Sequence, residues 1–108
     1  MDHPHTLRAA VYYSNLLVKM GSLQEAIDCY MRHLPPQQRV LGNDHPDVLT
    51  CCHNIGLCLL RLGRTRESVE YLEQCLTQRQ RVLGDAHVEV LRTRDILERA
   101  LATDQMKD

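Results

Sequence analysis

The sequence predicts an all-α protein, an α-solenoid in which antiparallel helix hairpins stack side by side to give five helices. Two observations carry this prediction: the chain repeats itself every 42 residues, and glycines mark the ends of the helical segments within each period. A third is composition, because the 108 residues include four Tyr but no Phe or Trp. A core of Leu, Val, Ile, Ala, Cys and Met suits close helix packing better than a sheet.

The repeat is clearest in two short motifs. DHP at 2–4 recurs at 44–46, and a weaker copy, AHV, lies at 86–88. The segment QRVLG at 38–42 is repeated without change at 80–84. Further residues follow in the same register: Leu7, Leu49 and Leu91; Leu17, Leu59 and Leu101; Gly21 and Gly63. Because one hairpin cannot bury its apolar face alone, such repeats are expected to stack into a curved solenoid.

The first period, residues 3–42, should form one helix hairpin. Its second helix should begin at the S-x-x-E capping box that Ser22 opens. Pro35 and Pro36 lie well inside this second helix. Because proline has no backbone N–H and disfavours helical geometry at the residue before it, we expect a break or sharp kink there. A short helical turn should resume at one of the two prolines.

The second period, residues 45–84, has the same punctuation. Asp44 is a suitable N-cap, and the proline two residues later falls in the first turn, where a missing N–H costs nothing. Gly63 suits the left-handed position that ends the first helix. The second helix should open near Thr65 and end at Gly84. Its apolar stripe consists of Val69, Leu72, Leu76, and Val82 or Leu83.

A single helix, residues 86–103, should follow the two hairpins and cap the solenoid. Arg94 and Glu98 lie in it at the positions that Cys52 and Gly56 hold one period earlier. Charged side chains suit a helix face that no further helix covers.

Residues 1–108 are thus expected to form one domain, with 104–108 as a disordered tail. The formal net charge of −1 gives no electrostatic footprint for nucleic acid. The apolar runs are too short to span a membrane. Five cysteines, an odd number without a CxxC pair, favour reduced thiols and a cytoplasmic location.

Four positions in each hairpin resemble the skeleton of the tetratricopeptide repeat. These are a small residue at Ser14 and Gly56, glycine at Gly21 and Gly63, a small residue at Ala26 and Ser68, and a bulky one at Tyr30 and Leu72. The common repeat has ~34 residues, and the longer period found here is similar to that of kinesin light chains and nephrocystin-3-like proteins. The resemblance covers nearly the whole chain and implies a non-catalytic scaffold or adaptor for protein partners.

The resemblance also implies that the first helix of each repeat lines a concave groove, which holds a peptide or helix of a partner. The corresponding residues are Arg8, Tyr12, Asn15 and Lys19; then Thr50, His53, Asn54, Leu57 and Arg61; then Arg92, Asp95 and Arg99. Spacings of three, four and seven residues place each set on one helix face. Asparagine amides can hydrogen-bond the N–H and C=O of a bound peptide.

Five of these groove residues are cations, and Asp95 is the single anion among them. We therefore expect a preference for acidic or carboxylate-terminated segments, since Arg and Lys attract carboxylates. The competing interpretation is an ordinary solvated helix face that binds no particular ligand.

A second hypothesis for the function is assembly. The outward side of the first helix would expose Leu7, Val11 or Leu16. Such an apolar edge would stack on a further repeat or on a second copy of the chain, giving an assembly module or a homo-oligomer.

Catalysis and metal binding have little support in the sequence. Cys52 and His53 are adjacent, but neighbouring helical residues point about 100° apart, which works against a pairing of thiol and base. His3, His45 and His87 recur in the same loop position, yet successive repeats would hold them on the order of 10 Å apart or more. We expect these histidines to serve the helix starts and the cysteines to fill a small-residue core, without metal or cofactor.

Overall fold

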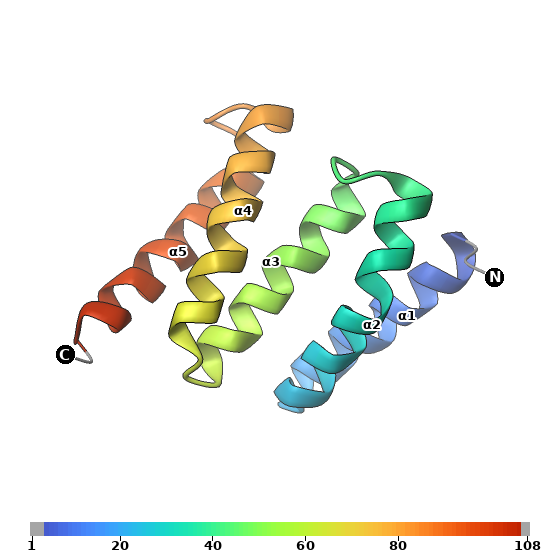
Figure 1. The fold of residues 1–108 in the computed structure, drawn as a ribbon, viewed down its shortest axis with the longest axis horizontal. Coiled ribbons are helices and arrows are strands. Elements are labelled where there is room, and N and C mark those ends of the chain that lie inside the picture. The colour runs from blue at the N-terminus through green and yellow to red at the C-terminus, as the bar shows by residue number, and fades with distance from the viewer. Residues whose placement is uncertain (1–3, 107–108) are drawn as a thin grey trace.

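The computed structural model describes the backbone of residues 4–106, together with the side chains of residue 9 and residues 12–104. Within this range the chain forms five helices: α1 (Pro4–Lys19), α2 (Leu23–Leu41), α3 (Pro46–Arg61), α4 (Thr65–Leu83) and α5 (Val88–Met106) (Figure 1). Each helix packs against the next one along the chain, and α3 also touches α5. The predicted all-α architecture is confirmed.

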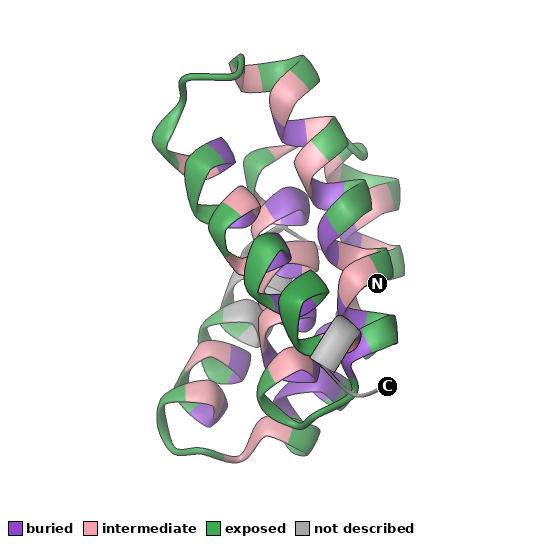
Figure 2. Cartoon of the chain, turned by 90° about the vertical axis from the view of Figure 1, so that its left-hand side faces the viewer, coloured by how far each residue is buried: buried purple, intermediate pink, exposed green. Residues whose placement is uncertain are grey.

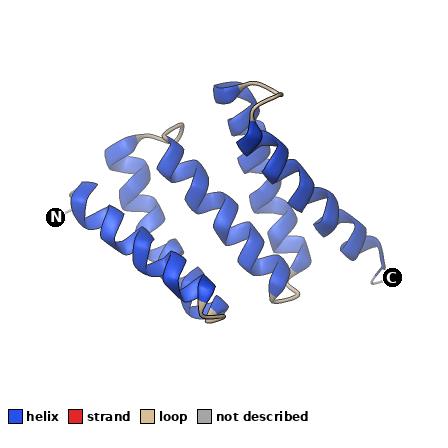
Figure 3. Ribbon diagram, turned by 180° about the vertical axis from the view of Figure 1, so that it is seen from behind, coloured by secondary structure: helices blue, strands red, loops and turns tan. Residues whose placement is uncertain are grey.

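The helices lie in two layers. Figure 3 shows α1, α3 and α5 nearest the viewer, with α2 and α4 behind them, and Figure 1 shows the opposite face. The layers alternate because each short loop sends the chain back antiparallel to the helix before it. The molecule measures 45 × 32 × 19 Å along its principal axes. The layer of α1, α3 and α5 carries the predicted groove residues.

The helices end at glycines, as the sequence predicts. Gly21 and Gly63 close the two hairpins with φ angles of 81° and 85°, and Gly42 and Gly84 end α2 and α4 with 90° and 88°. A Cβ atom is disfavoured in this left-handed region, so glycine suits all four positions. The N–H of Gly42 donates to the carbonyl of Gln38 at 3.0 Å and thereby closes the last turn of α2.

The core lies between the two layers and along the contacts between successive helices (Figure 2). Its larger cluster joins the first three helices through Leu17, Ala26, Ile27, Cys29, Tyr30, Cys51, Ile55, Cys58 and Leu59. A smaller cluster joins α4 and α5 through Leu72, Leu97 and Ala100. The predicted core of small residues is confirmed, because four of the five cysteines are buried.

Gly56 lets α3 and α4 pack closely. A Cβ atom at this position would lie 2.7 Å from Cδ2 of Leu72, which is too close for two carbon atoms. Glu98 holds the equivalent position in α5 and is exposed, while Arg94 on the same side is half-buried. The Glu98 side chain would obstruct a leucine placed as Leu72 is on Gly56.

The N-cap of α3 is His45, which corrects the prediction of Asp44. Nδ1 of His45 accepts a hydrogen bond from the backbone N–H of Asp47 at 3.0 Å. Asp44 instead forms a salt bridge with Arg81 of α4. An imidazole nitrogen with a free lone pair can cap a helix as a serine or aspartate oxygen does.

A second histidine, His87, caps the N-terminus of α5. Nδ1 of His87 accepts from the backbone N–H of Glu89 at 3.1 Å. The prediction that these histidines serve the helix starts is confirmed for His45 and His87, while His3 lies outside the described residues. The predicted capping box at the start of α2 is wrong, because the Ser22 side chain makes no capping hydrogen bond.

α2 runs without interruption through Pro35 and Pro36, so the predicted break is wrong. Each proline leaves the carbonyl four residues earlier without its helical donor. Pro35 is exposed and Pro36 half-buried, so this stretch of α2 lies near water. Tyr30 and Gln37, which are each only 1% exposed, anchor the helix in the core on either side. Packing therefore overrides the local preference of the proline pair.

α5 extends further than the sequence predicts. It begins at Val88 and continues to Met106, so the predicted disordered tail is wrong for residues 104–106. Asp104 lies 3.6 Å from Arg66 of α4, which ties this last turn to the neighbouring helix. Residues 107–108 lie outside the described part of the chain.

Candidate functional site

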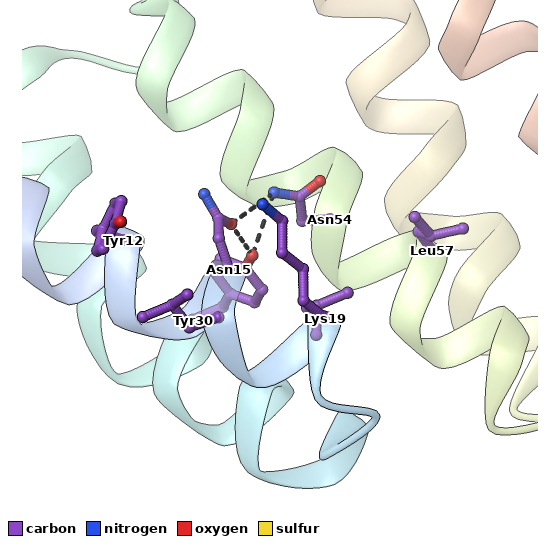
Figure 4. A pocket seen from close by; sticks show the side chains of 8 residues that line it. Tyr12, Asn15, Lys19, Tyr30, Asn54 and Leu57 are labelled. Carbon is purple, nitrogen blue, oxygen red and sulfur yellow. Dashed lines mark hydrogen bonds between the residues drawn. The ribbon is translucent and has the colours of Figure 1, made fainter.

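A hollow of about 330 Å³ opens between α1 and α3. Five of the predicted groove residues line it: Tyr12, Asn15, Lys19, Asn54 and Leu57 (Figure 4). The first three share one face of α1 because they are spaced three and four residues apart. Leu16, Val18 and Tyr30 complete the lining. The structure thus brings part of the predicted groove together as one site.

Three polar side chains form a hydrogen-bonded cluster in this hollow. The Tyr30 hydroxyl donates to Oδ1 of Asn15, and Nδ2 of Asn54 lies 3.2 Å from both Asn15 Oδ1 and the Tyr30 oxygen. These contacts orient both amides, because Oδ1 of Asn15 accepts and Nδ2 of Asn54 donates. The Asn15 nitrogen and the Asn54 oxygen point away from the cluster (Figure 4). The hollow therefore presents one amide donor and one amide acceptor.

Tyr30 reaches the hollow from α2, in the other layer, and holds the two asparagines in place. Its side chain is 1% exposed. Burial raises the pKa of the Tyr30 phenol, and the hydrogen bond from Asn54 offsets only part of that effect. The phenol therefore stays protonated at neutral pH and keeps donating to Asn15.

The remaining side chains give the hollow an apolar wall and a charged rim. Tyr12 is 68% exposed and Lys19 is exposed as well, while Leu57 is half-buried on α3. A bound segment would meet an aromatic ring, an aliphatic side chain and an ammonium group around the amide pair. Such a set of contacts suits a polypeptide, since it combines apolar area with a few placed polar groups.

Thr50 and His53, two further groove residues, belong to a separate network around Arg79 of α4. Arg79 is 2% exposed, and its guanidinium donates to Thr93 Oγ1 at 2.9 Å, to the Glu89 carbonyl at 3.2 Å and to Thr50 Oγ1 at 3.3 Å. It also lies 3.5 Å from the Glu89 carboxylate. Nδ1 of His53 lies 3.0 Å from Thr93 Oγ1. Arg79 therefore joins α3, α4 and α5 rather than opening toward a ligand.

His53 is neutral in this setting. Burial, together with the positive charge of Arg79, lowers the pKa of His53 to about 4. The imidazole consequently adds no positive charge to the groove at neutral pH.

Two of the predicted groove cations are paired within α5. Arg92 lies 2.9 Å from the carboxylate of Glu89, and Arg99 lies 3.2 Å from the carboxylate of Asp95. Asp95 and both arginines are exposed. The α5 part of the groove is therefore closer to electrically neutral than the sequence suggests.

Lys19 and Arg61 are the groove cations without a salt bridge among the described residues. They occupy the last turns of α1 and α3. These two helices run in the same direction because one antiparallel helix separates them, so both cations lie toward the same end of the layer. The side chain of Arg8 lies outside the described residues. The unpaired positive charge of the described groove thus lies toward one end of the layer, with Lys19 in the lining of the amide hollow.

The thiol chemistry of the adjacent cysteine and histidine has no geometric support. Burial raises the pKa of Cys52 to about 11, so its thiol is not activated as a nucleophile. His53 is engaged with Thr93 instead. Among the described residues, no group of three or more His, Cys, Asp or Glu side chains could hold a metal ion. None of the described helices is long and apolar enough to cross a membrane.

Sequence reasoning missed Tyr30 and Arg79, although each leaves a signal. A tyrosine at a core position of a helix needs a partner for its hydroxyl, and the asparagines of the neighbouring helices are the available acceptors. Arg79 lies three residues after Leu76 and four before Leu83, on the apolar side of α4. A cation on an apolar face predicts a buried ion pair or hydrogen-bond network.

Antiparallel helix hairpins in two alternating layers define a helical repeat protein. A family model described as Tetratricopeptide repeat matches residues 5–81 and 52–106. The chain belongs to this family, whose members are typically non-catalytic and generally serve as protein–protein interaction modules. Among curated proteins, none matches the chain.

Two solved structures show which repeats the fold resembles. One is the crystal structure of nearly identical TPR-like repeats of a kinesin light chain from Podosopora anserina, which superposes with a TM-score of 0.82 at 26% sequence identity. The match covers 98% of this chain and 50% of that chain. A variant of the same repeats, in which a glutamine is replaced by methionine, gives a TM-score of 0.80 at 28% identity, covering 99% and 51%. The chain thus spans about half the length of these structures. The predicted likeness to kinesin light chain-like repeats is confirmed.

Proposed function

We propose that this chain is a non-catalytic adaptor of the cytoplasm that binds an extended peptide segment of a protein partner in the hollow between α1 and α3. The oriented amide pair of Asn15 and Asn54 is the observation that carries this proposal. One free donor and one free acceptor can bond the C=O and N–H of a ligand backbone. Because Tyr30 already holds both amides, little side-chain freedom is lost when a ligand binds.

The charge near the amide pair favours an acidic or carboxylate-terminated segment. Lys19 lines the hollow itself, and Arg61 lies toward the same end of the layer. Neither cation has a salt bridge to another described residue, so both are available to a carboxylate. The α5 portion contributes less to this preference, since Arg92 and Arg99 are already paired.

Peptides selected by display against the intact chain test this function. Each acidic peptide is measured beside a partner in which Asp and Glu are replaced by Asn and Gln. We expect the neutral peptides to bind about tenfold more weakly or worse. Asn54→Ala combined with Lys19→Glu should abolish measurable binding, and Tyr30→Phe should weaken it about fivefold because the amides lose their common anchor.

Asn43→Ala provides the matched control, since Asn43 is an exposed asparagine outside the α1/α3 hollow. It should bind the peptides as the unmodified chain does. Circular dichroism of each variant separates lost binding from lost folding. Unchanged binding by a folded Asn54→Ala, Lys19→Glu variant would contradict the proposed groove.

A further inference from the structure

An apolar stripe runs along the outer side of α1 and borders the amide hollow at Leu16, which also lines that hollow. It consists of Ala9, Tyr13, Leu16 and Met20, which recur every three or four residues and so share one side of the helix. Tyr13 is 55% exposed, Leu16 is 40% exposed and Met20 is 74% exposed. We call this set the outer face of α1.

Three of these four register positions are buried in the other two helices of this layer, whereas Leu62, the equivalent of Met20 in α3, is 40% exposed. In α3 the residues that correspond to Ala9, Tyr13 and Leu16 are Cys51, Ile55 and Cys58, each 0% exposed. In α5 they are Thr93, Leu97 and Ala100, which are 0%, 8% and 0% exposed. The molecule thus contains two internal examples of what covers such a face.

In both examples the cover is the preceding helix of the other layer. Sγ of Cys51 lies 3.9 Å from the carbonyl of Tyr30 in α2. Sγ of Cys75 in α4 lies 3.8 Å from Oγ1 of Thr93. An antiparallel helix with an apolar stripe therefore fits against this register of α3 and of α5. The outer face of α1 continues the same surface by one more repeat.

A shallow trough beside the outer face matches the place that a covering helix occupies elsewhere. It has a volume of about 190 Å³ and is lined by Tyr13, Leu17, Glu25, Asp28, Cys29 and Arg32. One period later the corresponding residues include Ile55, Leu59 and Tyr71, which pack in the cluster that contains Ile27 of α2. The trough is thus the equivalent of the surface of α3, beside Tyr71 of α4, on which α2 packs.

The trough carries more negative than positive charge. Among the side chains that the structure describes, Glu25 and Asp28 line it together with one cation, Arg32. Asp28 accepts a hydrogen bond from the Gln24 side chain at 3.0 Å, and neither carboxylate forms a salt bridge with another described residue. Two copies of the chain joined through this face would bring like charges together, which disfavours a homodimer.

We propose that the outer face of α1 and its trough dock an amphipathic helix of a partner protein that carries Lys or Arg beside its apolar stripe. The apolar side chains of that helix cover Tyr13 and Leu16, as α2 covers the equivalent Ile55 and Cys58 of α3. Its cations lie beside Glu25 and Asp28. This surface does not include the amide cluster, and it meets the peptide hollow at Leu16, which lines both.

Two synthetic helices of about the length of α2 test this surface. They share one leucine stripe and differ only in the flanking residues, which are lysines in one and glutamates in the other. Isothermal titration against the intact chain should show binding of the lysine helix and at least about tenfold weaker binding of the glutamate helix. Tyr13→Lys should weaken binding of the lysine helix by about tenfold or more, since it removes apolar contact and adds a like charge.

Reversal of the trough charge supplies the complementary measurement. The Glu25→Lys, Asp28→Lys double variant should prefer the glutamate helix. Asn54→Ala, which alters the peptide hollow from α3 and changes no charge, should leave binding of both helices unchanged. This control also keeps failure of the docking face distinguishable from failure of the peptide groove.

Three results would overturn the proposal. The first is equal binding of both helices, and the second is unchanged binding of the lysine helix by a folded Tyr13→Lys variant. The third is a concentration-dependent dimer in sedimentation experiments that Tyr13→Lys disrupts, because a second copy would then be the occupant.

Discussion

Single residues set the chemistry of this molecule where they join helices from both layers. Tyr30 carries a hydroxyl from α2 to the asparagines of α1 and α3. Arg79 does the same from α4 to the hydroxyls of α3 and α5. The first residue leaves an open pair of amide atoms, whereas the second satisfies its partners internally. The same architecture thus yields an open polar site in one repeat and a closed one in the next.

His53 should make the stability of the chain depend on pH. Its pKa is about 4 in the folded chain, mainly through burial and then through Arg79, against about 6.5 for an unfolded histidine. Glu89 and Arg92 act on it as well, with opposite signs. Between these two values the unfolded chain binds a proton that the folded chain rejects. Stability should therefore fall as the pH drops from about 6.5 to 4, by up to about 3 kcal/mol from this residue.

Urea unfolding of the unmodified chain and of His53→Gln at several pH values measures this effect. The variant should show a flatter fall across that window, because glutamine does not titrate. The difference between the two curves isolates His53 from the carboxylates that also titrate there. Parallel curves would show that His53 is as accessible to protons in the folded chain as in the unfolded one.

At the scale of the helix, α2 shows how packing overrides a local preference. Pro35 and Pro36 predict a break, yet the helix continues through both. The equivalent residues of α4, Thr77 and Gln78, leave every helical donor in place. The α2 backbone is therefore held in a shape that its own sequence disfavours by the burial of neighbouring side chains.

Replacement of both prolines should stabilise the chain. Pro35→Ala with Pro36→Ala restores two helical hydrogen bonds and removes the clash with the preceding turn. Proline also restricts the unfolded chain, which offsets part of the gain. We expect a net increase of about 1–2 kcal/mol in the free energy of unfolding, measured by urea denaturation.

The same positions of α4 supply the control for this change. Thr77→Ala with Gln78→Ala alters exposed or half-buried residues in an unbroken helix. It should change stability by less than about 0.5 kcal/mol. A proline-free α2 that is no more stable than the unmodified helix would show that the prolines cause no strain.

At the helix starts, the sequence pattern predicts where a helix begins but not which residue caps it. A loop histidine recurs in every period, and His45 and His87 cap α3 and α5 through Nδ1. Sequence pattern places the helix start correctly but points to the neighbouring Asp44 as the cap. Asp44 instead accepts a hydrogen bond from Arg81 of α4, a residue 37 positions away along the chain.

For the whole molecule, the contact between the second hairpin and α5 depends on the buried Arg79 network. Arg79→Gln, which places there the residue found at the equivalent Gln37, should remove donors from Thr50, Thr93 and the Glu89 carbonyl. We expect a loss of about 2–3 kcal/mol in unfolding free energy, because buried acceptors lose charged partners. Amide hydrogen exchange should show α5 losing protection before α2 and α3 do.

Arg81→Gln is the matched control for this network. It makes the same substitution two residues further along α4, where the arginine forms an exposed salt bridge with Asp44. Exposed ion pairs contribute little, so stability should change little. Equal effects of the two substitutions would indicate that burial of Arg79 adds nothing to the packing of α5.

The groove was only partly predictable. Register and helix periodicity place Tyr12, Asn15, Lys19, Asn54 and Leu57 on one surface, and the structure brings them together. The same reasoning also assigns Thr50 and His53 to that surface, but both are engaged by a buried network. A periodic pattern shows which side of a helix a residue occupies. It does not show whether a side chain from another helix reaches that residue first.

The sequence by itself determined the 42-residue period, the helix ends at Gly21, Gly63 and Gly84, and the family to which the chain belongs. These features are local, since they follow from backbone preferences and from the spacing of apolar residues within one helix. Only the tertiary structure decided that α2 passes through its prolines and that Tyr30 orients two asparagines while Arg79 closes the second half of the groove. Each of these depends on side chains from different helices meeting in a buried space, where packing and hydrogen-bond satisfaction outweigh local preference.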